Sequence, residues 1–334
     1  MDDYNSKEIK KQGFRIKKKM TCDKKNDVVD KYKSKKIKNE DLIYFITKHL
    51  SEDNLNNIWN CGTFLSFFSD KSIKVKKLNK SNFCGNRFCP MCSWRRAKKD
   101  ALKISILLKY IQEVFKYEFI FLTLTAPNVK AADLNDEIKK YNNSFKNLMR
   151  NKEVSKISKG HIRKLEITYN EERDDYHPHF HVIIAVNKSY FKSRDYINKT
   201  RWLELWKYFM KDSTITQVDV RKMNTSDSNA IAEVAKYGAK DSDYMISQEV
   251  FDVFYKALKG KQIITYSLVF KDALSMYNDG LLDKYKEVDL TEYVFELCYK
   301  WSALKNYALL EARELTKEEI KKINKRLIDE EEVD

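Results

Sequence analysis

The stretch "DDYHPHFHVIIAV", residues 174–186, places three of the chain's five histidines directly before an apolar run. Successive side chains of a β-strand point to opposite faces of the sheet. The odd-numbered residues from His179 to Ala185 therefore share one face, and the even-numbered residues share the other. Two imidazoles, those of His179 and His181, lie together at one end of a strand whose remainder is apolar enough to be buried.

Two imidazoles on one face of a strand can converge on a single divalent cation. A third ligand must come from a neighbouring strand, and Glu166 in "IRKLEITYN" (162–170) is the candidate, because a buried carboxylate requires a cation or an ion pair. The mixed nitrogen and oxygen set leaves open coordination positions and suits Mn, Mg or another divalent ion that polarises a phosphate. His177 is expected either to contact the ligand residues from the side away from the metal or to contact the phosphate of the substrate. The alternative is a chance cluster of histidines at a strand edge.

The surrounding pattern predicts an α+β fold in which helices cover one face of an antiparallel sheet. Runs rich in β-branched and aromatic residues predict the strands, and amphipathic spacing predicts the helices between them. The predicted strands are 117–126, 162–170, 179–186 and 215–223, with a further one at 262–270, and the predicted helices are 100–116, 131–150 and 194–211. The stripe of Trp202, Trp206 and Phe209 is expected to be core.

Composition divides the chain into four predicted parts. Residues 1–40 are lysine-rich with little apolar periodicity and read as a basic flexible tail. Residues 41–99 hold a short helix and a cysteine module, and residues 100–245 hold the α+β domain. Residues 246–334 are expected to be mainly helical and to serve DNA binding or oligomerisation.

The charge of the chain favours a polyanionic partner. Lys and Arg total 64 against 49 acidic residues, a formal charge of +15. Such an excess favours nucleic acid, with a basic membrane-surface protein as the alternative. No apolar run is long enough to span a bilayer and no apolar signal core is visible, so a cytoplasmic protein without membrane contact is expected.

The cysteines have the spacing of metal ligands. The stretch "CGNRFCPMCSWRRAKK" places Cys84, Cys89 and Cys92 as C-x4-C-x2-C, and Cys61 lies upstream in "WNCGTF". Four thiolates arranged tetrahedrally are the ligand set of structural zinc, and a C-P-x-C turn directs two sulfurs to one point. A redox C-x-x-C is the alternative, but it needs no third or fourth cysteine.

A basic run with an aromatic neighbour, "WRRAKK", follows the last of these cysteines and includes Arg95 and Arg96. Such side chains release counterions from nucleic acid when they contact phosphates. The same run can equally be a solvated helix face.

The stretch "NAIAEVAKYGAKDSDY" (229–244) carries a second set of reactive groups. If its first twelve residues are helical, Glu233, Tyr237 and Lys240 share one stripe, with Lys236 to the side. A phenol is a poor nucleophile at neutral pH and would need a metal-polarised phosphate or a cation such as Lys236 or Lys240. Glu233 could act as general base for a water. The alternative is an ordinary amphipathic surface helix.

Together these motifs resemble a known family. "CGNRFCPMCSWRR", "FLTLTAPNV", "LEITYN", "HPHFHV" and "EVAKYGAK" follow one another in the order found in the replication initiator proteins of rolling-circle plasmids of Gram-positive bacteria, members of the HUH endonuclease superfamily. The resemblance covers about residues 58–275. The later segment "ITYSLVF" departs from the family pattern because it lacks glycines.

The resemblance implies a ferredoxin- or RRM-like antiparallel sheet with the two-histidine strand in its centre and the tyrosine helix beside it. His179 and His181 would be the metal-binding pair, with Glu166 as third ligand. Tyr237 would attack a phosphate at the plasmid origin, become linked to the DNA 5′ end and leave a 3′ hydroxyl for a polymerase. Glu233 would direct the water of the closing cleavage.

The implied partners are plasmid origin DNA, presented as a hairpin or single-stranded nick site in supercoiled duplex, and a host helicase and polymerase. The sequence leaves the choice between monomer and homodimer open. Two other functions are compatible with the motifs. One is an HUH transposase or relaxase, although relaxases usually place the tyrosine ahead of the histidines. The other is a non-catalytic, zinc-dependent DNA-binding protein.

Overall fold

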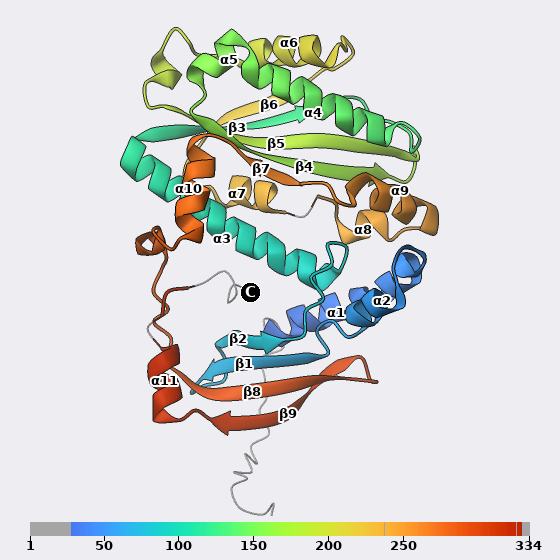
Figure 1. The fold of residues 1–334 in the computed structure, drawn as a ribbon, viewed down its shortest axis with the longest axis vertical. Coiled ribbons are helices and arrows are strands. Elements are labelled where there is room, and N and C mark those ends of the chain that lie inside the picture. The colour runs from blue at the N-terminus through green and yellow to red at the C-terminus, as the bar shows by residue number, and fades with distance from the viewer. Residues whose placement is uncertain (1–27, 237, 325, 329–334) are drawn as a thin grey trace, which may run out of the picture.

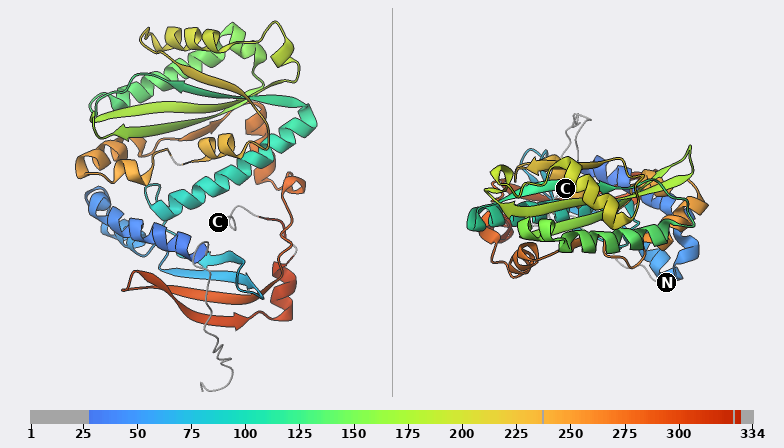
Figure 2. Two further views of the ribbon diagram at one scale, coloured as in Figure 1. Left: turned by 180° about the vertical axis from the view of Figure 1, so that it is seen from behind. Right: turned by 90° about the horizontal axis from the view of Figure 1, so that it is seen from above.

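The computed structural model describes residues 28–236, 238–324 and 326–328, and in these it contains two antiparallel sheets. Figure 1 shows the larger sheet above and the smaller sheet below, with the long helix α3 between them, and the view from behind in Figure 2 agrees. Among the described residues, no helix combines the length and apolarity needed to cross a bilayer.

The larger sheet has five strands in the order β6-β3-β5-β4-β7. Its strands are β3 (Tyr117–Thr125), β4 (Gly160–Asn170), β5 (Asp175–Asn187), β6 (Val218–Met223) and β7 (Ile264–Tyr266). The two-histidine strand β5 is central and pairs with β3 and β4 over nearly its whole length. The antiparallel α+β prediction is thus confirmed, and the four predicted strands of this region are present.

Helices cover both faces of this sheet, so the prediction of helices on one face is wrong. One face carries α4 (Leu134–Arg150), α5 (Lys152–Ile157) and α6 (Lys199–Met210); the other carries α3 (Pro90–Phe115), α7 (Ser228–Ala235) and α10 (Val269–Asn278) (Figure 1). The reason lies in β5, whose even-numbered residues pack into one buried cluster with Trp202 and Trp206. Ile183 and Ala185 pack into a second cluster with α3 and α7. Both faces are apolar, and both must be covered.

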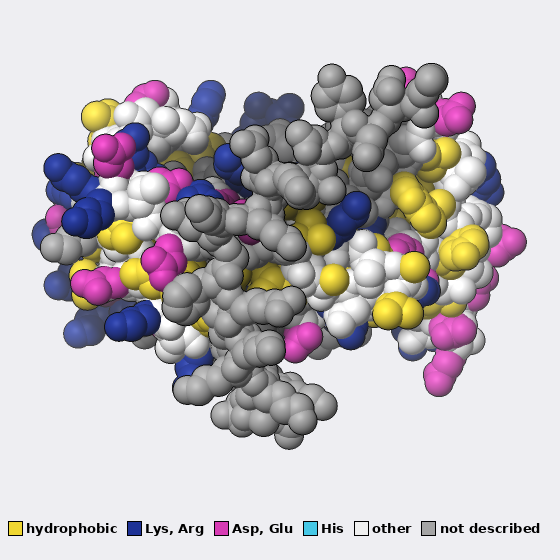
Figure 3. Space-filling view, turned by 90° about the horizontal axis from the view of Figure 1, so that it is seen from below, with side chains coloured by type: hydrophobic (Ala, Val, Ile, Leu, Met, Phe, Trp, Pro, Cys, Tyr) yellow, Lys and Arg dark blue, Asp and Glu magenta, His cyan; other side chains and the backbone are white. Residues whose placement is uncertain are grey.

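The smaller sheet joins the two ends of the described chain in the order β2-β1-β8-β9. Its strands are β1 (Phe64–Asp70), β2 (Lys76–Ser81), β8 (Tyr293–Ser302) and β9 (Asn306–Glu314). The prediction of a mainly helical 246–334 is therefore wrong for its second half, where "YVFELCYKWS" is rich in the aromatic and β-branched residues that favour strands. Figure 3 shows the molecule from below, where yellow hydrophobic side chains and charged ones both lie on the surface.

The prediction of a flexible tail over residues 1–40 is wrong for 28–40, which belong to α1 (Val28–Ile46); residues 1–27 lie outside the described part. The helix buries Tyr32, Lys36, Asn39 and Leu42 at helical spacing. Lys36 donates to the carbonyl of Trp59 (2.6 Å), and Asn39 donates to the carbonyl of Ile58. Two polar residues on the buried face hide the apolar periodicity that would have predicted this helix.

The remaining elements are short and lie between those named. They are η1 (Thr47–His49), α2 (Glu52–Trp59), η2 (Tyr190–Lys192), α8 (Asp241–Tyr244), α9 (Gln248–Leu258), η3 (Asp283–Tyr285) and α11 (Lys317–Ile323).

Candidate metal centres and the surrounding site

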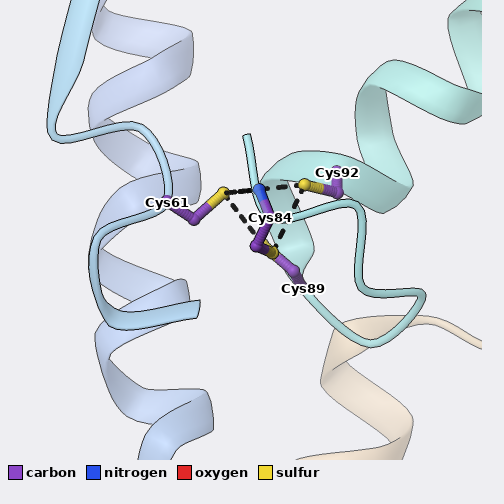
Figure 4. Close-up of side chains that lie close together, drawn as sticks. All are labelled: Cys61, Cys84, Cys89 and Cys92. Atoms are coloured by element: carbon purple, nitrogen blue, oxygen red, sulfur yellow. Dashed lines mark hydrogen bonds between the residues drawn. The ribbon is translucent and has the colours of Figure 1, made fainter. Parts of the chain in front are cut away.

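The four cysteines predicted as metal ligands come together at the start of α3. Figure 4 shows Cys61 from the loop before β1, Cys84 from the loop after β2, Cys89 directly before α3 and Cys92 in the first turn of α3. All four sulfurs lie within 4.8 Å of one another, and three of the separations are 3.5–3.6 Å. Sulfurs bound to a tetrahedral zinc lie roughly 3.8 Å apart, whereas a disulfide bond is about 2 Å long.

The backbone around these sulfurs fits thiolate ligands. The amides of Cys84, Gly85 and Asn86 each point at a cysteine sulfur at 3.3–3.4 Å. N–H groups directed at a sulfur stabilise its anionic form, which is the form that binds a metal. The predicted grouping of four cysteines is confirmed, and it favours a metal site over a two-cysteine redox pair. Zinc as the metal stays a prediction.

The second candidate centre lies on the face of the larger sheet that α7 covers. Glu166 on β4 is the register partner of His179 on β5, so their side chains share this face, and His181 follows two residues later. The Oε2 atom of Glu166 is 3.1 Å from Nε2 of His181 and 3.5 Å from Nε2 of His179. Adjacent ligands of an octahedral Mg²⁺ lie roughly 3 Å apart, so the three atoms can share one divalent ion.

Neighbouring groups fix the orientation of both imidazoles. Nδ1 of His179 lies 3.3 Å from the carbonyl oxygen of His177, which can only accept a hydrogen bond. The proton therefore belongs on Nδ1, and the Nε2 lone pair is directed toward Glu166. Nδ1 of His181 lies 3.3 Å from the Thr123 hydroxyl on β3, which leaves its Nε2 on the side of Glu166.

The ring of His177 is fully engaged within the protein. Its Nε2 lies 2.8 Å from the Thr125 hydroxyl, and its Nδ1 lies 2.7 Å from Oδ1 of Asn128. Burial and the neighbouring His179 lower the pKa of His177 to about 4. Of the two expected positions, the structure supports the one behind the ligands, where the His177 carbonyl orients His179.

The charge balance favours an ionised carboxylate at the centre. Burial disfavours the charged form of Glu166, but the close contacts with His179 and His181 and the charge of Lys164 outweigh the burial and hold the pKa of this carboxyl well below its usual range. An anionic oxygen beside two imidazole nitrogens is suited to a cation.

Lys164 is a site residue that the sequence analysis missed. It is fully buried, and it lies in register with His181, so it shares the ligand face. Its ammonium is 3.3 Å from the carbonyl oxygen of Glu233 near the end of α7. Burial lowers the pKa of Lys164 to about 8, although Glu166 opposes the shift. The alternation that placed Glu166 on this face was a signal for Lys164 as well.

Helix α7 brings Glu233 to the same centre. Its Oε2 lies 3.8 Å from Nδ1 of His181, on the edge of the ring opposite Nε2, and about a third of its side chain is exposed. At this separation the carboxylate faces the Nδ1 edge of His181 without a direct hydrogen bond, and it remains within reach of solvent water.

The predicted helix over 229–240 ends at Ala235, so Glu233 and Lys240 do not lie on one helix as predicted. Helix α7 stops at Ala235, and Lys236 is extended, with ψ of 157°. The carbonyl of Gly238 then accepts from the amide of Ile167 on β4 at 2.7 Å. The chain thus pairs with β4 instead of continuing the helix, and Lys240 is the N-cap residue of the next helix, α8.

Tyr237 itself lies outside the described residues, but its two neighbours bracket the position. Lys236 is exposed and Gly238 is buried against β4, one residue along from Glu166. A Cβ on Gly238 would lie 3.2 Å from the Leu165 carbonyl oxygen and 3.1 Å from Ile263, so glycine permits this close approach. Lys240 is also exposed.

The two arginines of the basic run have different surroundings. Arg95 is buried, donates to the Tyr32 hydroxyl and stacks on Phe83, so it fits neither of the two alternatives, a phosphate contact or a solvated helix face. Arg96 is exposed and donates to the carbonyl of Gly85 at 2.9 Å. The helix places adjacent residues about 100° apart, which separates the buried arginine from the exposed one.

The geometry defines an α+β protein with two candidate metal centres, one of four cysteines and one of a glutamate and two histidines on a central strand. A family model described as Replication protein matches residues 75–307. The chain is 51% identical over 221 residues to a "Protein rep" of Staphylococcus aureus, which covers 66% of this chain and 96% of that protein. It is 34% identical over 281 residues to a "Protein rep" of Bacillus amyloliquefaciens, covering 75% and 83%.

The chain therefore belongs to this replication protein family, and the resemblance to the replication initiators of Gram-positive bacteria is confirmed. No solved structure gives a significant match.

Proposed function

We propose that the chain is a rolling-circle plasmid replication initiator that nicks its origin in a metal-dependent reaction and becomes linked to the DNA through Tyr237. The observation that carries this proposal is the convergence of Glu166, His179 and His181 on one point beside α7. The chain leaving α7 through position 237 is hydrogen-bonded to β4 next to Glu166. A replication protein with a cation site at this place has the parts for phosphoryl transfer.

In the first cut, the phenolic oxygen of Tyr237 forms a bond to the scissile phosphorus while the bond from phosphorus to the 3′ oxygen breaks. The phenolic proton is transferred, in net terms, to the leaving 3′ oxygen, which becomes the primer hydroxyl. A divalent ion held by Glu166, His179 and His181 would polarise the phosphate. Lys164 holds the end of α7 through the Glu233 carbonyl, which orients the segment that carries the nucleophile.

In the closing cut, a water takes the place of the phenol. Glu233 accepts a proton from the water while the water oxygen bonds to phosphorus, and it passes this proton to the new 3′ oxygen as that oxygen leaves. That 3′ hydroxyl then attacks the phosphotyrosine, releases the phenol and closes the circle. The phosphotyrosine preserves a phosphodiester for rejoining, whereas hydrolysis ends the cycle.

The test uses supercoiled plasmid carrying the chain's own origin, with Mn²⁺ or Mg²⁺. We expect relaxed circles and a protein-linked 5′ end, both lost in Tyr237→Phe, and both retained in the matched control Tyr208→Phe, which alters an exposed tyrosine on α6. Normal nicking by Tyr237→Phe would contradict the tyrosine assignment. Origin binding without any nicking by the wild-type chain would favour the non-catalytic, zinc-dependent DNA-binding protein instead.

A further inference from the structure

A basic cavity lies at the end of α7. It is open to solvent, has a volume of about 410 Å³ and is lined by α3, the last residues of α7, the segment 261–266 and α10. Its charged lining consists of five basic side chains and a single carboxylate, an excess of four positive charges: Arg87, Arg96, Lys103, Lys236 and Lys261, with Asp100. Like charges repel inside a shared recess, so this arrangement favours an anionic occupant.

Part of this charge is held in place by the protein. The guanidinium of Arg87 donates to the carbonyls of Leu258 and Lys261, and Arg96 donates to that of Gly85. Within the described ranges, the ammonium groups of Lys236 and Lys261 have no carboxylate within ion-pair distance. Two oriented guanidinium groups and two unneutralised ammonium groups therefore line one recess.

The cavity adjoins the Glu/His/His centre through α7. Ala235 and Lys236 line the cavity, whereas Glu233 reaches His181. Ala235 follows Glu233 by two helical residues, about 3 Å along the axis, so the two features lie next to each other along α7. The segment 261–266, which lines another side of the cavity, is bonded to the same sheet, because the amide of Leu165 on β4 donates to the carbonyl of Ile263 at 3.0 Å.

We propose that this cavity binds a backbone phosphate of single-stranded DNA adjacent to the scissile phosphate. The proposal rests on the function proposed above and assigns a second phosphate position to the same substrate. A duplex is too wide for a recess of this size, whereas one nucleotide of a flexible strand fits it. Ile264, Tyr266 and Leu274 supply an apolar wall for the sugar or base beside the charged wall.

The same geometry links the cysteine module to the proposed DNA-binding cavity. Arg87 lies in the loop between Cys84 and Cys89, and the carbonyl that accepts from Arg96 belongs to Gly85, whose amide points at the sulfur of Cys92. Two cations of the cavity are therefore positioned by the four-cysteine cluster.

The experiment measures binding of the full chain to a labelled oligothymidylate of about twenty nucleotides, which carries no origin, between about 50 and 200 mM salt. The slope of log K against log salt is expected to weaken by about 0.7 for each phosphate that the variant no longer neutralises. We expect this weakening in Lys261→Ala and Arg96→Ala, and a slope close to wild type in Lys261→Arg. Asp100→Asn, which removes the carboxylate, is expected to bind more tightly.

The matched control is Lys146→Ala, which removes an exposed lysine from α4 on the other side of the sheet. Unchanged slopes in Lys261→Ala and Arg96→Ala would overturn the proposal, as would an equal reduction of the slope in Lys146→Ala. Thermal unfolding of each variant checks that the fold is intact, and Lys261→Arg separates the effect of charge from the effect of packing.

The two proposals fail in different ways. If Tyr237→Phe abolishes nicking while the cavity variants keep the wild-type slope, the cavity assignment is wrong and the nicking function stands. If the cavity variants show the reduced slope while Tyr237→Phe nicks normally, the cavity binds DNA and the assignment of the nucleophile is wrong.

Discussion

Glu233 occupies a position that allows two roles, and a single substitution separates them. Its carboxylate is 3.8 Å from Nδ1 of His181 and partly exposed to water. If its role is to accept a proton from water, Glu233→Ala should make the first cut at a rate within a few-fold of wild type but fail to release monomeric circles. Single-turnover nicking of supercoiled plasmid, with the circular products resolved on a gel, measures both steps.

Normal release of monomeric circles by Glu233→Ala would contradict the role in termination. A loss of about tenfold or more in the first cut would instead show that the carboxylate acts mainly by orienting His181, since removing such partners of metal ligands costs roughly 10–100-fold.

His161 gives the protein a pH-dependent stability. Its ring packs against Phe145 and contacts the Ser267 hydroxyl, and burial lowers its pKa to about 4 from the ordinary 6.5. Between pH 6.5 and 4 the unfolded chain binds a proton that the folded chain does not, so stability falls as the pH falls through this window. The full shift corresponds to about 3 kcal/mol.

Chemical unfolding of wild type and His161→Asn between pH 4 and 7 measures this contribution. The variant should lose less stability on acidification, while part of the dependence remains because the pKa of His177 is lowered in the same direction. Identical pH profiles for the two proteins would exclude the assignment to His161.

For single residues, the sequence predicted well which side chains share the sheet face of the candidate metal ligands, because the alternation of side chains along a strand is a local rule. It placed His179, His181 and Glu166 together without knowledge of the fold. It missed Lys164, since a lysine in a strand is ordinarily exposed and its burial depends on α7, which covers the sheet from more than sixty residues away.

At the scale of elements, the break after α7 depends on a glycine. A side chain at Gly238 would press on Ile263 and on the Leu165 carbonyl oxygen, which belongs to the backbone of β4. Gly238→Ala should displace the chain after α7, and Gly238→Val should do so more strongly, at a cost of about 1–3 kcal/mol from overpacking.

Gly238 follows position 237 directly. We therefore expect the nicking rate to fall strongly from glycine to alanine to valine at position 238, while the melting temperature falls only slightly. Nicking rates and thermal unfolding of the same preparations test this. Wild-type nicking by Gly238→Val would show that the approach to β4 does not position the nucleophile.

The same break explains why the sequence predicted a longer helix. Residues 229–240 have helical spacing, and only the glycine hinted at an end. The helix ends before Lys236 because the following residues hydrogen-bond to β4 instead. This strand lies about seventy residues earlier in the chain, so the end of the helix is not a local property of the sequence. The strands of the larger sheet were predictable because their composition is strongly biased, whereas α1 was hidden by its buried lysine and asparagine.

At the scale of the whole molecule, the smaller sheet could not be predicted, because nothing local links its halves. β1 pairs with β8 along its full length from Phe64 to Asp70, although more than two hundred residues separate the two strands. Alternation within each strand indicates that it has a partner but does not identify the partner. The resemblance covers residues 58–275 and therefore did not include the β8–β9 hairpin.

This pairing makes the hairpin a support of the cysteine module. The Tyr307 hydroxyl donates to the carbonyl of Gly62 at 2.6 Å, one residue from Cys61, and the indole of Trp301 donates to Glu40 on α1. A chain ending at residue 291 would lack β8 and β9 and expose Leu65 and Phe67, which are fully buried in the intact protein. We expect the truncated chain to bind less than one metal per molecule and to be cleaved by protease within the module.

Tyr307→Phe removes only the hydroxyl and should lower the free energy of unfolding by about 1 kcal/mol, with a measurable loss of metal affinity, while Tyr208→Phe should change neither. Metal analysis, competition with a chelator and thermal unfolding read out both variants. Since the module also positions Arg87 and Arg96, the truncated chain should show the weakened salt dependence expected of the cavity variants. Full metal content and wild-type stability in the truncated chain would show that the module stands without the hairpin.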